Sequence, residues 1–395
     1  MQYAARMDGV RPSAIRELLR LGDDPTVTSF GGGYPDPALF PVAELKAAFD
    51  HVLDHAGRAS LQYTASIGLP TLRAAVAQRM TGDGAPTSVE DVLVLQGAQQ
   101  GLDLVAKMLV DPGDLVVTAN PTFLGALIAF NPYQPAYLGI DGDADGLDTA
   151  ALEVELRAGA RPRFVYVVPD FANPTGATLS LARRHHLLAL AQEFDFLVLE
   201  DTPYRELRYE GATLPTLLSL DGEGRVIHLG SFSKTLAPGL RMGWAVARPD
   251  LLERMGLLKL AADTQSSTLN MAVTARLLSE FDLDAHVMTI RHAYRHKRDL
   301  MLTTMHEAFP DSVAFTEAAG GLFTWVTFPA GFDAAAFMAD QALPKARVAY
   351  VPGATFFPVH QEANHARFSY SGVADDRLVA GVHRLGELLS IELGG

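Results

Sequence analysis

Three successive apolar runs in the middle of the sequence each lead into side chains that could do chemistry together. Residues 164–168 are followed by Asn173, and residues 196–199 are followed by Asp201 and Tyr204. The third run, residues 226–229, leads into two hydroxyls, a lysine and an arginine: Ser231, Ser233, Lys234 and Arg241. Ligands of an open parallel sheet bind beyond the carboxyl ends of its strands. We therefore expect these side chains to converge on one site.

The elements that must position them alternate along the chain. Two further apolar runs lie at 92–95 and 115–118, and helical spacing occurs at 71–80, 99–109 and 181–193. Short apolar runs bounded by turn residues and separated by helices indicate a parallel sheet that is covered on both faces. The expected fold class is therefore α/β.

A smaller unit is expected at the C-terminal end. From about residue 300 the pattern becomes α+β, with candidate strands at 326, 349–351 and 367–370. Residues 12–19 have the spacing of a short amphipathic helix, and three glycines follow at 31–33. We expect residues 1–44 to belong to the small domain, residues 45–285 to form the large domain, and residues 286–395 to complete the small one.

The composition excludes several classes of function. A formal net charge of −14 argues against nucleic acid or an anionic membrane as the main partner. The chain has no cysteine, which rules out disulfides, thiolate metal sites and cysteine nucleophiles. It shows no signal-peptide pattern and no apolar run long enough to span a bilayer, so we expect a cytoplasmic protein.

A turn that suits a phosphate follows the run at 92–95. Gly97, Ala98 and Gln99 open a helical pattern, and the free N–H groups at the start of a helix bind anions. Strand–turn–helix joints often use glycine, so this turn gains weight only beside the other residues.

Taken in order, these motifs resemble the fold-type I aminotransferases that depend on pyridoxal 5'-phosphate. The resemblance covers essentially the whole chain and rests on four motifs: Asn173-Pro-Thr-Gly176, Asp201-x-x-Tyr204, Ser231-x-Ser-Lys234 and Arg241. It implies a large cofactor-binding domain with a mostly parallel sheet of the seven-stranded type, beside a smaller α+β domain.

The resemblance also implies roles. Lys234 would bind the cofactor aldehyde and later move the proton at the substrate Cα, while Asp201 would pair with the ring nitrogen. Asn173 and Tyr204 would donate hydrogen bonds to the ring hydroxyl oxygen. The phosphate would be held by the remaining polar groups, and Phe123 would stack on the ring. The residues that would hold the phosphate are Gly97, Ala98, Gln99, Ser231, Ser233 and Arg241.

Two arginines would bind the substrate. Arg367 matches the family's arginine for the substrate carboxylate. Arg16, with the Gly32 loop and Tyr63, resembles the subgroup of α-aminoadipate, kynurenine and aromatic aminotransferases, in which the N-terminal arginine reads a distal carboxylate. Tyr63 matches a tyrosine that reaches the phosphate from the neighbouring subunit, so the family implies a homodimer with shared sites.

Alternatives remain at this point. The expected reaction moves an amino group between an L-amino acid (glutamate, 2-aminoadipate, leucine or an aromatic one) and a 2-oxo acid such as 2-oxoglutarate. Fold-type I lyases and decarboxylases use the same lysine and aspartate, and some GntR-family transcription regulators carry an aminotransferase-like sensor domain. No basic DNA-binding segment precedes residue 13, which disfavours a regulator. Histidine pairs at 51/55 and 292/296 have a spacing able to bind metal on a helix, but lack evident partners, so we expect no metal.

Overall fold

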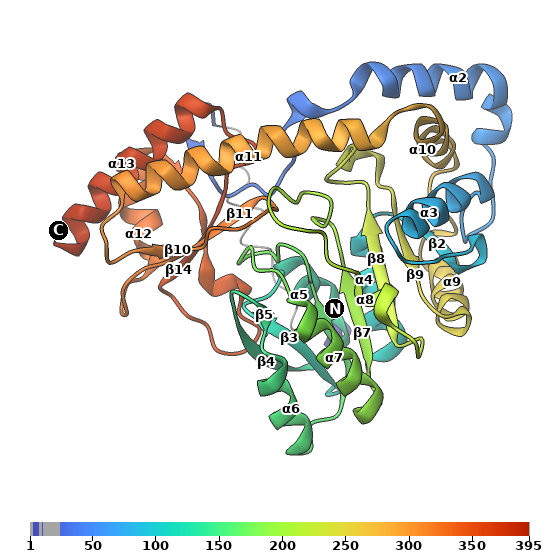
Figure 1. Ribbon diagram of the computed structural model, residues 1–395, viewed down its shortest axis with the longest axis horizontal. Helices are drawn as coiled ribbons and strands as arrows, with labels where there is room; N and C mark the ends of the chain where they lie inside the picture. Colours follow the sequence, from blue (N-terminus) through green and yellow to red (C-terminus); the bar gives the residue numbers. More distant parts are fainter. Residues whose placement is uncertain (1–2, 8–9, 11–23, 395) are drawn as a thin grey trace.

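The computed structural model describes residues 3–7, 10 and 24–394. Its largest element is an eight-stranded sheet (Figure 1). The strands follow one another across the sheet in the order β2 (Val92–Leu95), β9 (Gly243–Val246), β8 (Val226–Ser231), β7 (Leu197–Asp201), β6 (Pro162–Val167), β3 (Leu115–Asn120), β4 (Ala136–Asp143) and β5 (Gly146–Leu147). From β8 to β4 all neighbours are parallel, whereas β9 and β5 run antiparallel to their neighbours.

Helices cover both faces of this sheet because its central strands β6, β7 and β8 are almost entirely buried on both faces. One face packs against α4 (Ala98–Leu109), α5 (Leu124–Phe130) and α9 (Pro249–Asp263). The other packs against α6 (Thr149–Arg157), α7 (Leu181–Phe194) and α8 (Leu217–Leu220). At the β2 end lie α2 (Val42–Ser60), α3 (Pro70–Gly82) and α10 (Thr268–Glu280).

A second sheet lies at the other side of the molecule, at the left in Figure 1. It is antiparallel, in the order β10 (Ala314–Phe315), β11 (Phe323–Thr327), β14 (His365–Ser369) and β13 (Val351–Pro352). It shares a core with α12 (Ala334–Phe337), α13 (Asp375–Leu393) and part of α11 (Leu283–Ala308), the long helix that runs across the top of the view from α10 to α13.

An early segment of the chain joins this second unit. β1 (Thr28–Ser29) pairs in parallel with β12 (Val348–Ala349), and Phe30 is fully buried in the same core. The remaining short helices are η1 (Ala5–Met7), η2 (Pro37–Leu39), η3 (Val89–Asp91), η4 (Asn131–Tyr133), η5 (Pro238–Leu240), the π-helix η6 (Met338–Ala346) and η7 (Gly353–Phe356). In the described part of the chain, no helix is both long and apolar enough to cross a membrane.

The expected α/β class with a large, mostly parallel sheet is confirmed. The five expected strands of that sheet are all present, and β4, β5 and β9 are additional, with β5 a two-residue partner of β4. The strand expected at 349–351 is divided into β12 and β13 around Tyr350. The helix expected at 12–19 lies outside the described residues, and the domain boundaries stay a prediction.

Candidate active site

The residues expected to act together come from neighbouring strand ends of the large sheet. Asp201 is the last residue of β7, Ser231 is the last of β8, and Asn173 lies in the loop after β6. Because these strands are parallel, all three side chains start from one edge of the sheet. The small antiparallel sheet contributes Arg367 from β14.

Lys234 reaches across to the N-terminal segment, where its Nζ donates a hydrogen bond to the Gly33 carbonyl at 2.8 Å. Burial lowers the pKa of Lys234 to about 8, and the nearby charges of Arg367 and Arg241 act in the same direction. A lysine with this pKa has a sizeable neutral fraction near neutral pH. It is therefore suited to bond covalently to a carbonyl carbon and to exchange a proton.

Asp201 is buried, and its two carboxylate oxygens differ. Oδ2 accepts a hydrogen bond from Tyr166 Oη at 3.0 Å, whereas Oδ1 has no partner in the described part of the chain. Burial raises the pKa of Asp201 to about 6, opposed by the Tyr166 hydrogen bond and by His228. A buried carboxylate oxygen without a partner fits a ligand that brings an N–H donor, as the protonated ring nitrogen of pyridoxal phosphate would.

A buried pair supports Asp201 from the adjoining strand positions. Glu200 and His228 face each other in register across β7 and β8, with His228 Nδ1 2.8 Å from Glu200 Oε2. Glu200 also accepts hydrogen bonds from the backbone N–H groups of Leu217 and Leu218. This pair fixes the strand end on which Asp201 sits.

Three polar groups meet where the small sheet touches the large one. Arg367 Nη1 donates to Asn173 Oδ1 at 3.0 Å, and its Nη2 donates to the Gly31 carbonyl at 2.7 Å. Asn173 Nδ2 lies 3.5 Å from Tyr204 Oη. Burial raises the pKa of Tyr204 to about 12, so its hydroxyl stays protonated and can donate.

Arg367 is buried against an aromatic ring, with its guanidinium carbon 4.3 Å from the ring centre of Phe323. Burial lowers its pKa to about 10, so it remains a cation at neutral pH. Its Nε has no partner among the described residues. A buried cation with an unsatisfied donor suits a carboxylate ligand.

The loops that carry Asn173 and Tyr204 are held together by a buried carboxylate, that of Asp170. Asp170 accepts hydrogen bonds from Arg184 at 3.0 Å, from Arg208 at 3.1 Å and from Arg205 at 3.5 Å. Asp170 precedes Asn173 in one loop, and Arg205 directly follows Tyr204 in the next. The cluster therefore ties together the two loops that present Asn173 and Tyr204.

The turn at Gly97 is built against Arg241. Gly97 has a φ of 75°, and a Cβ placed there would lie 2.6 Å from Arg241 Nη2. Arg241 Nη2 donates to the Gln96 carbonyl at 2.9 Å, and Ser231 Oγ donates to Ser233 Oγ at 2.8 Å. Ala98 is the first residue of α4, so free N–H groups, two hydroxyls and a guanidinium border one spot. This donor set fits a phosphate.

Gln99 and the loop around Gly32 make contacts that the sequence did not predict. The Gln99 side chain donates to the Gly125 carbonyl at 2.7 Å, beside the Phe123 ring. In the glycine loop the carbonyls of Gly31 and Gly33, which flank Gly32, make the contacts with Arg367 and Lys234.

Tyr63 is 80% exposed, and its side chain makes no hydrogen bond within the described part of the chain. Arg16 lies outside the described residues. Tyr166, Phe323 and Gly31 were not expected from the sequence.

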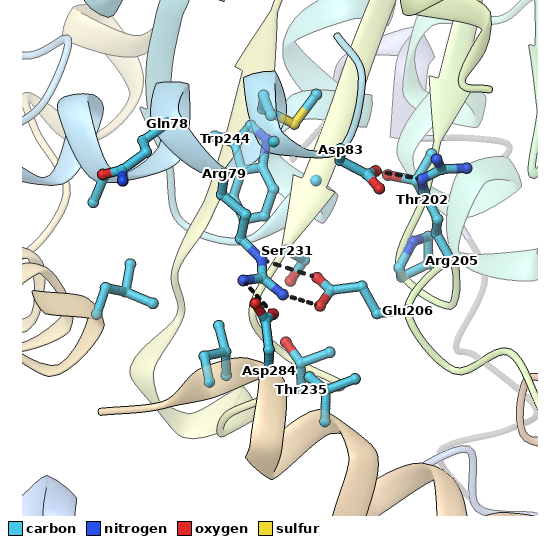
Figure 2. Close-up of a pocket in the computed structure, with 18 of the residues that line it drawn as sticks. Gln78, Arg79, Asp83, Thr202, Arg205, Glu206, Ser231, Thr235, Trp244 and Asp284 are labelled. Carbon is cyan, nitrogen blue, oxygen red and sulfur yellow. Dashed lines mark hydrogen bonds and ion pairs between the residues drawn. The ribbon is translucent and has the colours of Figure 1, made fainter. Parts of the chain in front are cut away.

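Figure 2 shows a cavity that Thr202, Ser231 and Thr235 help to line, and its volume is about 610 Å³. In it Arg79 forms ion pairs with Glu206 and, at 3.1 Å, with Asp284. These ion pairs join α3, the loop after Tyr204 and the start of α11. They hold the loop after Tyr204 against α3 and α11.

The described residues were searched for a possible metal site. No group of three or more His, Cys, Asp or Glu side chains there could hold a metal ion. The rings of His51 and His55 stack on each other with their centres 4.2 Å apart.

Comparison with known proteins gives a consistent result. Residues 30–385 match the model of the family "Aminotransferase class I and II". Aromatic-amino-acid aminotransferase 1 of Thermococcus litoralis is 37% identical over 99% of this chain and 94% of its own length. The 2-aminoadipate transaminase of Thermus thermophilus is 38% identical over 96% of this chain and 94% of its own length.

Among solved structures, kynurenine aminotransferase of Pyrococcus horikoshii, in complex with PMP, matches with a TM-score of 0.94 at 37% identity. The alignment covers 99% of this chain and 97% of that one. The match to the family model, the near full-length similarity and the site geometry lead to one conclusion. The chain belongs to the class I and II aminotransferases, and is a fold-type I transaminase that depends on pyridoxal 5'-phosphate.

Proposed function

We propose that this aminotransferase moves an amino group between a dicarboxylic or apolar L-amino acid and a 2-oxo acid such as 2-oxoglutarate. Glutamate, 2-aminoadipate, leucine and aromatic amino acids are the proposed donors. The observation that carries the proposal is the pair of separate arginines, Arg241 and Arg367, whose charges both act on Lys234. Arg241 borders the Gly97 turn, and Arg367 is buried under Asn173. Two separated cations suit two anions, the cofactor phosphate and the substrate carboxylate.

Each residue then has a definite task. When bound, pyridoxal phosphate supplies an aldehyde that combines with amines and a ring that draws electrons from the substrate Cα. Asp201 Oδ1, which has no partner among the described residues, would accept the ring N–H and keep that nitrogen protonated. Asn173 and Tyr204 donate to the ring hydroxyl oxygen. Because its low pKa leaves part of its amine neutral, Lys234 would take the proton from the substrate Cα.

Arg367 orients the substrate. Its free Nε and its Nη groups would bind the carboxylate in two places, which fixes the direction of the Cα–H bond relative to Lys234. Phe123 would stack on the cofactor ring. Arg16, argued from the sequence alone, would bind the distal carboxylate of an acidic donor.

The experiment is a half-reaction with single donors. The purified protein is mixed with glutamate, 2-aminoadipate, leucine or phenylalanine, and the conversion of the lysine-bound cofactor to its aminated form is followed by absorption. We expect all four donors to convert the cofactor. In Arg16→Ala, conversion by glutamate and 2-aminoadipate should be lost. Release of carbon dioxide or ammonia without the matching 2-oxo acid would favour a decarboxylase or lyase instead.

We also propose that two copies of the chain share their sites through Tyr63, whose ring is exposed in the single chain. Mixing inactive Lys234→Ala with a weakly active Tyr63→Phe variant should restore part of the activity, because one of the two hybrid sites is then intact. No restoration, with dimers formed normally, would refute the shared site. A cytoplasmic location stays a prediction.

A further inference from the structure

One short segment contacts two of the parts of the chain that we assign to the cofactor phosphate. It is the α9–α10 junction, residues 263–268, between the last residue of α9 and the first turn of α10. The first of the two parts is the Gln96–Gly97 turn, and the second is the loop that carries Tyr63. The inference below rests on the proposed function, because it concerns how firmly that phosphate is held.

The junction reaches the turn through Gln100. Gln100 Nε2 donates to Asp263 Oδ2 at 2.7 Å, and Gln100 Oε1 accepts from the Gln96 backbone N–H at 2.9 Å. The carbonyl of Gln96 accepts from Arg241 Nη2 at 2.9 Å. The residue before Gly97 is therefore held from both sides, by Arg241 and by the chain that ends at Asp263.

Asp263 is itself anchored by a buried charge. Lys259, one turn earlier in α9, is fully buried, and its Nζ lies 2.8 Å from both Asp263 oxygens. A buried ammonium needs its carboxylate, since an unpaired charge in the interior is costly. Asp263 is therefore not free to leave Gln100, and the link to the turn is rigid.

The other side of the junction holds the Tyr63 loop. Gln265 Oε1 accepts a hydrogen bond from the Thr64 backbone N–H, and Gln265 Nε2 donates to Thr268 Oγ1 at 2.7 Å. Thr268 Oγ1 donates in turn to the Gln62 carbonyl at 2.9 Å. The backbone on both sides of Tyr63 is thus fixed, although the ring itself is exposed.

Thr264, which lies between Asp263 and Gln265, has an unusual backbone conformation. Thr264 has a φ of 63° and a ψ of −52°, a strained γ-turn conformation that a β-branched residue rarely adopts, and the Gln265 N–H donates to the Asp263 carbonyl across it at 2.6 Å. Such a conformation persists only when its surroundings impose it. Here it lets Asp263 and Gln265, which are two residues apart, reach two different loops.

We propose that Asp263 and Gln265 are positioning residues for the cofactor phosphate. Asp263 sets the Gln96–Gly97 turn through Gln100, and Gln265 sets the loop that offers Tyr63 to the neighbouring subunit. Each phosphate is then held through the junctions of both subunits: one positions the Gln96–Gly97 turn, and the other positions Tyr63 of the neighbouring subunit. Neither residue touches the reacting atoms.

The test compares two cofactors that differ only in the phosphate. In Gln100→Met, a side chain of similar length cuts the link between Asp263 and Gln96 without adding or removing charge. We expect the Kd for pyridoxal phosphate to rise about tenfold, and the Kd for pyridoxal, which has no phosphate, to stay unchanged. Both are measured by absorption titration of protein freed of cofactor. Gln192→Met, an exposed position on α7, is the matched control.

The second arm is tested by a double-mutant cycle. Gln265→Met and Tyr63→Phe should each weaken pyridoxal phosphate binding, and together no more than the stronger one alone, because both act through one contact. Additive effects would refute the role of Gln265. Equal weakening of pyridoxal and pyridoxal phosphate by Gln100→Met would refute that of Asp263.

A failure of the proposed function looks different. Wild-type protein that binds neither pyridoxal phosphate nor pyridoxal would remove the aminotransferase assignment, and the positioning roles with it. A wild type that prefers the phosphorylated cofactor, with that preference unchanged in Gln100→Met, would refute the positioning role alone.

Discussion

Lys234 is held in a position that is good for chemistry and poor for stability, and replacing it should show this. Its pKa falls from 10.5 to about 8 because burial, Arg367 and Arg241 disfavour the charged amine. This lowering of the pKa corresponds to about 3 kcal/mol of lost stability at pH 7, where both the folded and the unfolded state are mostly protonated. Lys234→Met removes this cost and also the hydrogen bond to Gly33, worth about 1 kcal/mol. Because the lysine is partly accessible, we expect a net gain of about 1–2 kcal/mol in the free energy of unfolding of the cofactor-free protein.

The pH dependence makes the expectation specific. Between about pH 8 and pH 10.5 the unfolded lysine binds a proton and the folded one does not, so wild-type stability rises with pH in that window. The advantage of Lys234→Met should therefore shrink steadily from about pH 8 upward and nearly vanish by about pH 10.

The assay is denaturant unfolding of both proteins at one fixed protein concentration, since the stability of a dimer depends on concentration. Lys107→Met, an exposed lysine on α4, is the control and should change stability by less than about 0.5 kcal/mol at either pH. A variant less stable than wild type at pH 7, or an advantage that does not change with pH, would refute the reasoning.

Three further changes test the site. Asp201→Asn removes the charge that holds the ring nitrogen protonated, so turnover should fall at least about a hundredfold while pyridoxal phosphate still binds; a variant with wild-type turnover would contradict this. Tyr166→Phe removes the hydrogen bond that lowers the Asp201 pKa, so that pKa should rise above about 6 in an NMR titration of the cofactor-free protein, and a fall would oppose it. Arg367→Lys keeps the charge but loses the two-point contact, so KM for the amino donor should rise about tenfold with pyridoxal phosphate affinity unchanged. Loss of cofactor binding instead would place Arg367 at the phosphate.

The sheet was predictable where its strands are buried on both faces. β2 is a continuous apolar run, and β6 and β8 are mostly apolar apart from Arg163 and His228, so the sequence pattern finds all three. β4 has only one fully buried residue and ends in Gly and Asp, so it lacks that signal. β9 is short, and only the three-residue η5 separates it from β8, so a pattern in which strands alternate with α-helices does not find it.

The site was predictable to the extent that its residues follow strands. Asn173 and Lys234 follow strands and Asp201 ends one, and they meet because these strand ends are neighbours. Tyr166 is a mid-strand residue whose sequence pattern is that of the core, and only the register of β6 with β7 brings it to Asp201. The contacts of Gly31 and Gly33 are made by carbonyls, which every residue has, so no residue type could reveal them.

The pairing of β1 with β12 constrains how a cell must make this protein. Thr28 lies beside Val348, and Phe30 accepts a hydrogen bond from the backbone N–H of Ser369. A ribosome releases the glycine loop early, but the strands that hold it appear only near the end of synthesis, after the whole large sheet. The nascent chain must therefore carry this loop unpaired while the large sheet folds. Lys234 would gain its Gly33 contact, and the enzyme its complete site, only when translation is almost finished.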